Sequence, residues 1–168
     1  MTHMHRLCVF IAIWMMLAAC AVTPPQSAPS VTQLAPSVTP LAPTATQPAC
    51  QPSPTQTSKN DFPEVRGTMH TQGEMWALLF FDQAYARQDA KIAWRITGTG
   101  QQFSARAQHT DGTIVLPIWG PEYHGGSSWE RPGNEWGTGF NFSEPGCWTL
   151  TITRGATIGE IRLDVLAP

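Results

Sequence analysis

Charge is scarce in this chain of 168 residues, because ten Lys and Arg and twelve Asp and Glu make up only 13% of it. Soluble globular proteins carry about 25%. The basic residues are spread singly and the formal net charge is −2. No basic surface is available to neutralise phosphates, so a nucleic-acid partner is not expected. A chain of this length has room for one domain.

Signatures of catalysis and of cofactor binding are also missing from the sequence. It contains no glycine-rich phosphate loop, no dinucleotide-binding fingerprint and no Cys-x-x-Cys pair. The segment Gly125-Gly126-Ser127-Ser128 lacks the Gly-x-Ser-x-Gly pattern that holds the nucleophile of many hydrolases. We therefore expect neither an enzyme nor a bound cofactor or structural metal.

The N-terminus has the organisation of an export signal. A short segment that ends at Arg6 supplies positive charge, and an apolar run follows from Leu7 to about Leu17. A membrane-spanning helix needs about 20 apolar residues. Since this run is shorter, it is better explained as a signal sequence over residues 1–19 than as a permanent membrane span.

The tetrapeptide Leu17-Ala18-Ala19-Cys20 resembles the lipobox of bacterial lipoproteins. The resemblance implies that Cys20 receives a diacylglycerol and becomes the first residue after cleavage by signal peptidase II. Two or more acyl chains anchor a protein stably. We thus expect a lipid-anchored protein on the extracytoplasmic side of the cell membrane. The alternatives are an ordinary signal peptide cleaved near Ala19 and an uncleaved anchor.

Residues 20–60 are expected to form a disordered linker. From residue 21 to residue 58 there is no charged and no aromatic side chain, and Pro, Ser, Thr, Gln and Ala dominate. Such a segment cannot bury enough apolar surface to offset its ordering entropy. Cys50 lies in this linker, where we expect a free thiol. The alternative is a disulfide with Cys147, since exported proteins fold in oxidising surroundings.

Residues 61–168 are predicted to be an all-β domain, an immunoglobulin-like antiparallel β-sandwich. Aromatic and β-branched residues become frequent here, and short strand-like runs are bounded by turn residues. The runs cover residues 73–81, 91–97, 103–108, 113–119, 140–142, 147–153 and 157–166. No helical stripe occurs, although residues 82–90 have room for one helical turn. About seven to eight strands fit an immunoglobulin-like sandwich.

The faces of two strands can be predicted from their alternation. One face of residues 91–97 collects Ile92, Trp94 and Ile96, and one face of residues 147–153 collects Trp148, Leu150 and Ile152. His109 precedes the turn Thr110-Asp111-Gly112, a hairpin signal, and is expected to be a solvated turn residue.

The stretch Glu144-Pro145-Gly146-Cys147-Trp148-Thr149-Leu150-Thr151-Ile152 resembles the start of the penultimate strand in many bacterial immunoglobulin-like domains. Those domains place a tyrosine where this chain has Trp148. The resemblance implies the sandwich fold, but it carries no binding residues over to this chain.

We expect the domain to be a monomer.

Residues 119–136 are predicted to form a long loop at one end of the sandwich, and loops of this length are usually functional or disordered. Three interpretations of this loop stay open. In the first, the aromatic rings stack on a sugar, and Glu122, Asn134 and Glu135 bind its hydroxyl groups. In the second, a metal is bound by Glu122, His124 and either Glu130 or Glu135. In the third, the loop packs on itself, and Arg131 pairs with Glu130 or Glu135. We favour the self-packed loop. The candidate ligand-binding residues are Trp119, Tyr123, Trp129, Glu135 and Trp136.

Together these features predict a cell-envelope lipoprotein that displays a small β-sandwich for binding, adhesion or sensing. Its partners would be the membrane, through the lipid on Cys20, and an envelope carbohydrate or protein. The alternatives are a structural accessory domain without a small ligand and a carbohydrate-binding module that uses residues 119–136.

Overall fold

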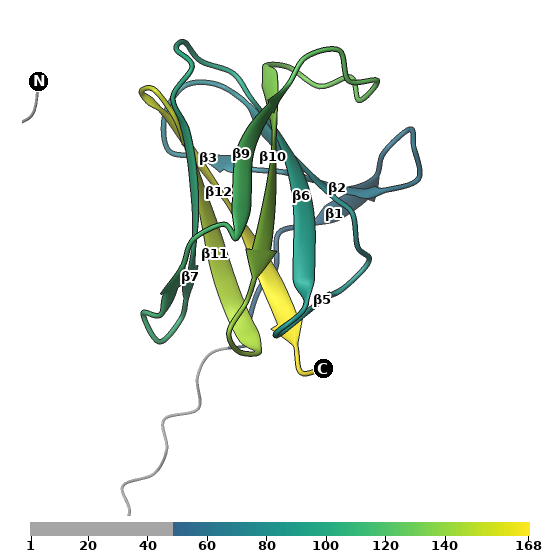
Figure 1. The fold of residues 1–168 in the computed structure, drawn as a ribbon, viewed down its shortest axis with the longest axis vertical. Coiled ribbons are helices and arrows are strands. Elements are labelled where there is room, and N and C mark those ends of the chain that lie inside the picture. The colour runs from purple at the N-terminus through teal and green to yellow at the C-terminus, as the bar shows by residue number, and fades with distance from the viewer. Residues whose placement is uncertain (1–48) are drawn as a thin grey trace, which may run out of the picture. The chain divides into compact units, whose positions relative to one another are not determined.

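The computed structural model describes residues 49–168, and every regular element in them is a β-strand (Figure 1). The strands are β1 (Thr55–Thr57), β2 (Pro63–Arg66), β3 (Thr68–Met69), β4 (Met75–Leu79), β5 (Ala84–Tyr85), β6 (Asp89–Ile96), β7 (Phe103–His109), β8 (Ile114–Val115), β9 (Trp119–His124), β10 (Asn134–Asn141), β11 (Gly146–Arg154) and β12 (Thr157–Leu166). Over this part of the chain, no helix has the length and hydropathy needed to cross a bilayer. The signal sequence, Cys20 and most of the linker lie outside the described residues.

The strands form two six-stranded sheets, which is consistent with a β-sandwich. The first sheet has the order β1-β2-β4-β6-β10-β9, and the second has the order β3-β12-β11-β7-β8, with β5 beside β12. All pairs are antiparallel except β5 with β12. The predicted all-β class is confirmed, with more strands than the seven to eight that the sequence indicated.

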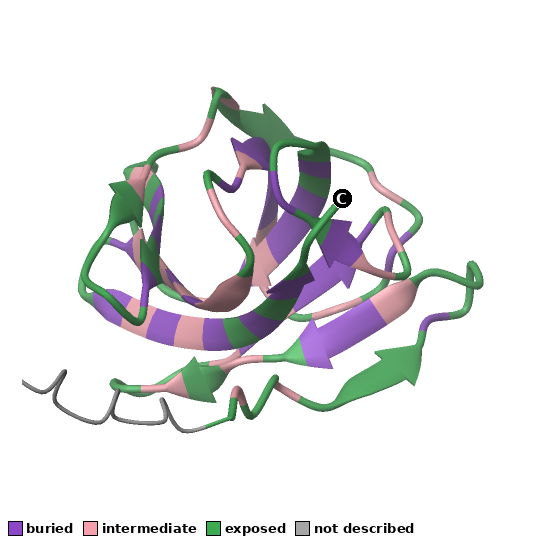
Figure 2. Ribbon diagram, turned by 90° about the horizontal axis from the view of Figure 1, so that it is seen from below, coloured by how far each residue is buried: buried purple, intermediate pink, exposed green. Residues whose placement is uncertain are grey.

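The core lies between the sheets and follows the predicted alternation. Ile92, Trp94 and Ile96 on β6 are fully buried, and so are Leu150 and Ile152 on β11. Figure 2 shows buried residues alternating with more exposed ones along the long strands. Each large apolar side chain buried in this way contributes about 1.5–3 kcal/mol. The alternation of apolar residues therefore predicted correctly which side chains of these strands face the core.

The predicted loop over residues 119–136 is wrong, because half of its residues lie in the two strands of a hairpin. β9 and β10 pair with each other, and only residues 125–133 connect them. Gly120, Pro121, Gly137 and Gly139 weakened the strand signal, since glycine and proline are uncommon inside strands. The helical turn considered for residues 82–90 is absent as well, because that segment contains β5 and the start of β6.

The expected free thiol at Cys50 is also wrong, since Cys50 forms a disulfide with Cys147 at the start of β11. Beyond it, the Ser53 amide donates to the Arg162 carbonyl (2.9 Å) and the Ser53 hydroxyl accepts from the Arg162 amide (2.9 Å). β1 then pairs with β2. Residues 50–60, which the sequence placed in the linker, are thus held against the sandwich. Their side chains on β1 are all exposed, so no hydrophobic pattern revealed this strand.

Candidate functional site

The β9–β10 hairpin distributes the candidate residues over two faces of the first sheet. Tyr123 lies opposite Trp136, and His124 lies opposite Glu135. Because side chains alternate along a strand, Tyr123 and Trp136 lie toward the core, and His124 and Glu135 lie on the outer face. The five candidates therefore do not form a single surface.

Trp136 is a core residue. It is only 3% exposed, stacks on Phe103 with ring centroids 4.8 Å apart, and lies under the Arg154 guanidinium at 4.9 Å. Tyr123 packs edge-on against Trp136 at 5.7 Å but keeps 56% of its surface exposed. A ligand can therefore reach Tyr123 but not Trp136.

Trp129 is buried as well, because residues 125–133 fold back onto a buried carboxylate of β2. The Trp129 indole donates to Glu64 (2.8 Å), Arg131 donates to both Glu64 oxygens, and the Gln56 amide donates to the same carboxylate (2.8 Å). The Glu64 side chain is fully buried. We call Glu64, Trp129 and Arg131 the latch.

The latch keeps Glu64 ionised. Burial raises the pKa of this carboxyl, but hydrogen bonds from Arg131, Gln56 and Trp129 outweigh burial and hold the pKa below its usual value. The hydrogen bond to Glu64 raises the pKa of Arg131 in turn. A carboxylate with three hydrogen-bonding partners has little capacity left for a ligand, so the latch is a structural contact.

The remaining contacts of the latch complete a small second hydrophobic cluster on the outer face of the first sheet. Trp129 clusters there with Leu78 and Ala93, and the Arg131 guanidinium lies 4.2 Å above the Trp76 ring. A cavity of about 30 Å³ beside the latch has room for water molecules only. These contacts favour the self-packed interpretation for this part of the hairpin.

The expected ion pairs within residues 119–136 are wrong. Arg131 pairs with Glu64, which is 67 residues away in sequence, and not with Glu130 or Glu135. Glu130 instead pairs with Lys59 at 2.6 Å on the surface, and Glu135 pairs with Arg95 at 3.1 Å. Glu135 is only 7% exposed, so its carboxylate binds Arg95 and is not accessible to a ligand.

Trp119 is the remaining aromatic candidate, and it is half-buried. Its indole lies against Gly139 of β10, where any side chain would collide with the ring, and the His124 imidazole similarly covers Gly137. The two glycines therefore make room for the side chains of β9. Trp119 and Tyr123 are the two candidates that retain accessible ring surface.

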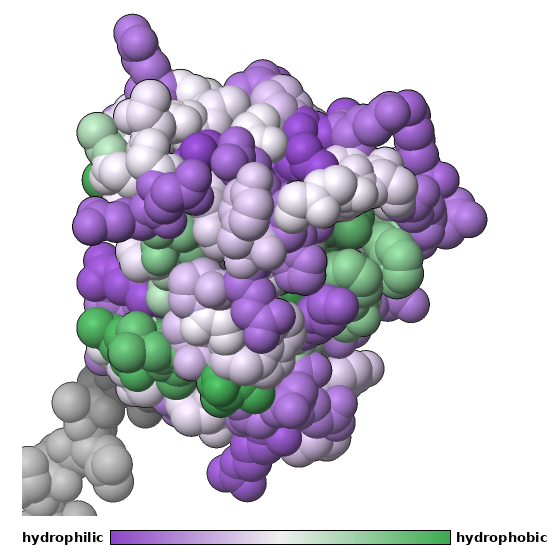
Figure 3. Space-filling model, turned by 45° about the horizontal axis from the view of Figure 1, so that its top comes forward, coloured by the Kyte–Doolittle hydropathy of each residue, from purple (hydrophilic) through white to green (hydrophobic). Residues whose placement is uncertain are grey.

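Exposed aliphatic residues precede β9. The sequence did not single them out as a candidate site. Ile114, Leu116 and Ile118 are 51%, 66% and 53% exposed, and we call them, with Tyr123, the apolar edge. Ile114 lies on β8, Leu116 and Ile118 follow it, and Tyr123 lies on β9; β8 and β9 are each one edge strand of a sheet. Figure 3 shows hydrophobic side chains gathered at the lower left of the view. The sequence Ile114-Val115-Leu116-Pro117-Ile118 could have indicated this exposed surface. Its apolar residues lie on both faces of an extended segment, and a segment at a sheet edge cannot bury both faces.

A hollow of about 380 Å³ adjoins Leu116 on the outer face of the second sheet. Arg106, Thr151, Thr153 and Ile158 also line it. Apolar and polar atoms therefore both lie beside the apolar edge.

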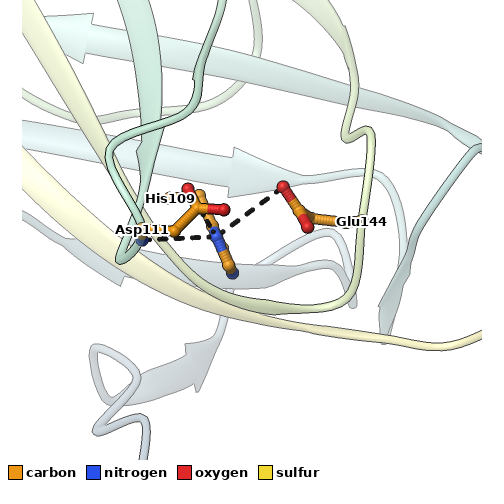
Figure 4. A group of neighbouring side chains, drawn as sticks. All are labelled: His109, Asp111 and Glu144. Atoms are coloured by element: carbon orange, nitrogen blue, oxygen red, sulfur yellow. Dashed lines mark hydrogen bonds and ion pairs between the residues drawn. The ribbon is translucent and has the colours of Figure 1, made fainter. Parts of the chain in front are cut away.

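The metal set considered for residues 119–136 is not assembled. Within residues 49–168, the group of three ligand-type side chains that come together is His109, Asp111 and Glu144, from the β7–β8 and β10–β11 turns (Figure 4). His109 is only 9% exposed, so the expected solvated turn residue is wrong. Its Nδ1 lies 3.0 Å from Asp111 Oδ1 and 3.8 Å from Glu144 Oε1.

Asp111 is fixed as an anion at this cluster. The backbone amide of Thr113 donates to Asp111 Oδ1 at 2.7 Å, and this bond, together with His109, lowers the pKa of Asp111 to about 2. The His109 ring packs on Trp148 with centroids 5.0 Å apart. Sequence reasoning missed this cluster because its members come from two turns that only the fold brings together.

No protein-family model, curated protein or solved structure matches this chain.

Proposed function

We propose that this protein is a lipid-anchored binding module of the cell envelope. Lipid on Cys20 holds the chain at the extracytoplasmic face of the membrane, and the linker displays an immunoglobulin-like sandwich that binds another envelope protein through the apolar edge. The observation that carries the binding proposal is the exposure of Ile114 on the edge strand β8 and of Leu116 and Ile118 in the segment that joins it to β9.

The Cys50–Cys147 disulfide supports the extracytoplasmic location. Disulfides persist in secreted and periplasmic proteins, whereas the cytosol keeps thiols reduced. The bond joins the last part of the proline-rich segment to β11. It therefore agrees with the export that the signal sequence and the lipobox predict.

The chemistry of the apolar edge supports a protein partner. Contiguous exposed aliphatic side chains mark interaction surfaces, and the outermost strands of a sheet offer unpaired backbone groups to a partner strand. β8 combines both features, because it ends its sheet on the described chain and carries Ile114, with Leu116 and Ile118 directly after it; β9 ends the other sheet. Aliphatic side chains suit the apolar surface of a protein better than the polar surface of a sugar.

Two tryptophans support the finer classification as an immunoglobulin-like domain. Trp94 is fully buried between the sheets, as is the core tryptophan of immunoglobulin domains. Its indole donates to the Thr138 hydroxyl at 2.8 Å. Trp148 lies near the start of the penultimate strand β11 and is also fully buried.

Carbohydrate recognition is the second candidate function. The Trp119 ring is held against Gly139, and a rigid, half-accessible indole suits stacking on the apolar face of a sugar ring. A glycan array probed with the native protein and with Trp119→Ala tests this candidate. Loss of a glycan signal in Trp119→Ala, but not in Leu116→Glu, would favour carbohydrate recognition over the protein partner.

Mass spectrometry of the membrane fraction tests the anchor. We expect a peptide that begins at Cys20 and carries acyl chains, and we expect Cys20→Ser to lose this modification and its membrane association. Cys8→Ser is the matched control, because Cys8 lies within the apolar run and should leave lipidation intact. An unmodified Cys20 still joined to Ala19 would contradict the proposal.

Site-specific photocrosslinking on intact cells tests the partner surface. A photoreactive residue at position 116 is expected to give a discrete crosslinked product. At position 166 it should not, since Leu166 is 41% exposed on β12, which is separated from β8 by two strands. The product should disappear when Ile118→Glu is added. Equal products from both positions, or a product that is a second copy of this chain, would contradict the proposed function.

A further inference from the structure

We propose that His109, Asp111 and Glu144 form a binding site for one divalent transition-metal ion of the zinc class. The three side chains converge at the end of the second sheet where β7 runs into β8 and β10 runs into β11 (Figure 4). The proposal is independent of the apolar edge and of the lipid anchor.

His109 Nδ1 is within hydrogen-bond distance of Asp111, and the three ligand atoms lie close enough together for small side-chain rotations to bring them onto one ion. Ligands of a tetrahedral zinc ion, with bonds of about 2.0–2.1 Å, lie about 3.3 Å from one another. His109 Nδ1 is 3.0 Å from Asp111 Oδ1 and 3.8 Å from Glu144 Oε1, and all three ligand atoms lie within 4.8 Å of one another. The separation from Glu144 is too long for a hydrogen bond but suits two ligands of one ion.

The imidazole is oriented before any ion arrives. The His109 ring is packed against Trp148 and covers Gly146, where a side chain would collide with it. The His109 amide donates to the Thr113 carbonyl at 2.8 Å, and the Thr110 amide donates to the Cys147 carbonyl at 3.2 Å. These contacts fix the ring with Nδ1 directed toward the two carboxylates.

The two carboxylates come from anchored turns but remain accessible. The Thr113 amide holds Asp111, and the Glu144 carbonyl accepts the Trp148 indole N–H at 3.0 Å. The Asp111 and Glu144 side chains are 47% and 41% exposed. An ion can therefore enter from solvent, and water can complete its coordination.

The ligand set selects the class of metal. Ca²⁺ and Mg²⁺ prefer all-oxygen sites, whereas an imidazole with carboxylates suits Zn²⁺ and its neighbours in the first transition series. The site carries two negative charges when His109 is neutral, so a divalent cation neutralises it. Bound metal would join the β7–β8 turn to the β10–β11 turn, beside the Cys50–Cys147 disulfide.

Titration calorimetry of the full chain, freed of metal and then titrated with ZnCl2, tests the proposal. We expect the native chain to bind one more Zn²⁺ ion than Glu144→Gln does, or to bind that ion at least about tenfold more tightly. Ligands elsewhere in the chain contribute equally to both proteins, so the difference isolates this site. His124→Gln is the matched control for a histidine outside the cluster and should bind as the native chain does.

Two further measurements keep the test decisive. His109→Gln should also lose the ion, but His109 is buried, so its thermal unfolding is compared with that of Glu144→Gln, whose altered side chain is exposed. Zn²⁺ should raise the Tm of the native chain more than that of Glu144→Gln. Identical Zn²⁺ binding by native protein and Glu144→Gln, or equally tight binding of CaCl2 at this site, would overturn the proposal.

Discussion

At the scale of single residues, Glu64 makes the stability of the domain sensitive to acid. Its carboxylate is ionised and buried, and its pKa is lower in the folded protein than its ordinary value of 4.5. The unfolded chain therefore binds a proton more readily than the folded one, and stability falls as the pH falls. The stabilisation from ionised Glu64 is fully present above pH 4.5 and is lost as the pH decreases through the folded pKa.

We therefore expect Glu64→Gln to lower the free energy of unfolding at pH 7 by about 2 kcal/mol, since it weakens hydrogen bonds to a charged group. The variant should also lose less stability than the native protein between pH 5 and pH 3. Urea denaturation across this range measures both effects. Glu122→Gln is the control, because Glu122 is exposed on β9. Parallel pH profiles for native protein and Glu64→Gln would show that Glu64 does not act in this way.

Two neighbouring tryptophans allow a matched comparison. Trp129 Nε1 donates to buried Glu64, whereas Trp76 Nε1 is buried without a hydrogen-bond partner in the described part of the chain. Trp76→Phe removes an unsatisfied donor and keeps a ring beneath Arg131, so we expect a change of at most about 1 kcal/mol. Trp129→Phe should cost about 2 kcal/mol. Chemical denaturation checks the order, and equal losses would contradict the assigned roles.

The same residues show why sequence reasoning reached the core but not the latch. The burial of Ile92, Trp94 and Ile96 follows from alternation within eight residues of β6. Glu64 and Arg131 lie 67 positions apart. No local pattern links them, so nothing in the sequence distinguished Glu64 from the other acidic residues. The burial of Trp129 and Trp136 depended on the same long-range packing.

At the scale of elements, the segment between Cys50 and β1 depends on its disulfide more than on packing. β1 is three exposed residues at the edge of the first sheet. A disulfide that closes a loop of about 100 residues stabilises a protein mainly by restricting its unfolded state. The Cys50–Cys147 bond spans 97 positions.

We expect Cys50→Ser to lower the free energy of unfolding by about 3 kcal/mol. Urea denaturation with and without a reductant measures this, and reduced native protein should behave like the variant. Cys20→Ser is the control, because it makes the same chemical change at a cysteine of the mature chain outside the disulfide. If reductant leaves native protein unchanged while Cys50→Ser is destabilised, the loss comes from something other than the bond.

Elements with strong alternation were predictable, and elements made by backbone pairing alone were not. β6, β11 and β12 follow from their sequences almost residue for residue. β1 has no apolar side chain, and β9 contains Gly120 and Pro121. These two strands form because β2 and β10 present unpaired backbone groups to them. The residue pattern within one segment does not reveal such pairing.

At the scale of the whole molecule, the apolar edge should affect association and not folding. Leu116 is 66% exposed, so we expect Leu116→Glu to change the free energy of unfolding by no more than about 0.5 kcal/mol. Analytical ultracentrifugation should show a monomer in both proteins, since the proposed partner of this edge is another protein and not a second copy of this chain. Leu166→Glu serves as the control. A large fall in stability for Leu116→Glu would mean that this edge belongs to the core.

The Cys50–Cys147 bond also decides how the domain responds to mechanical tension. A pull that arrives along the chain before Cys50 passes through the sulfur bridge straight to β11, so the segment with β1 carries no load. β11 is flanked by β12 on one side and β7 on the other, and it must break backbone bonds to both before it can leave. Reduction would redirect the same force to β1, an edge strand of three residues that can be unzipped one bond at a time.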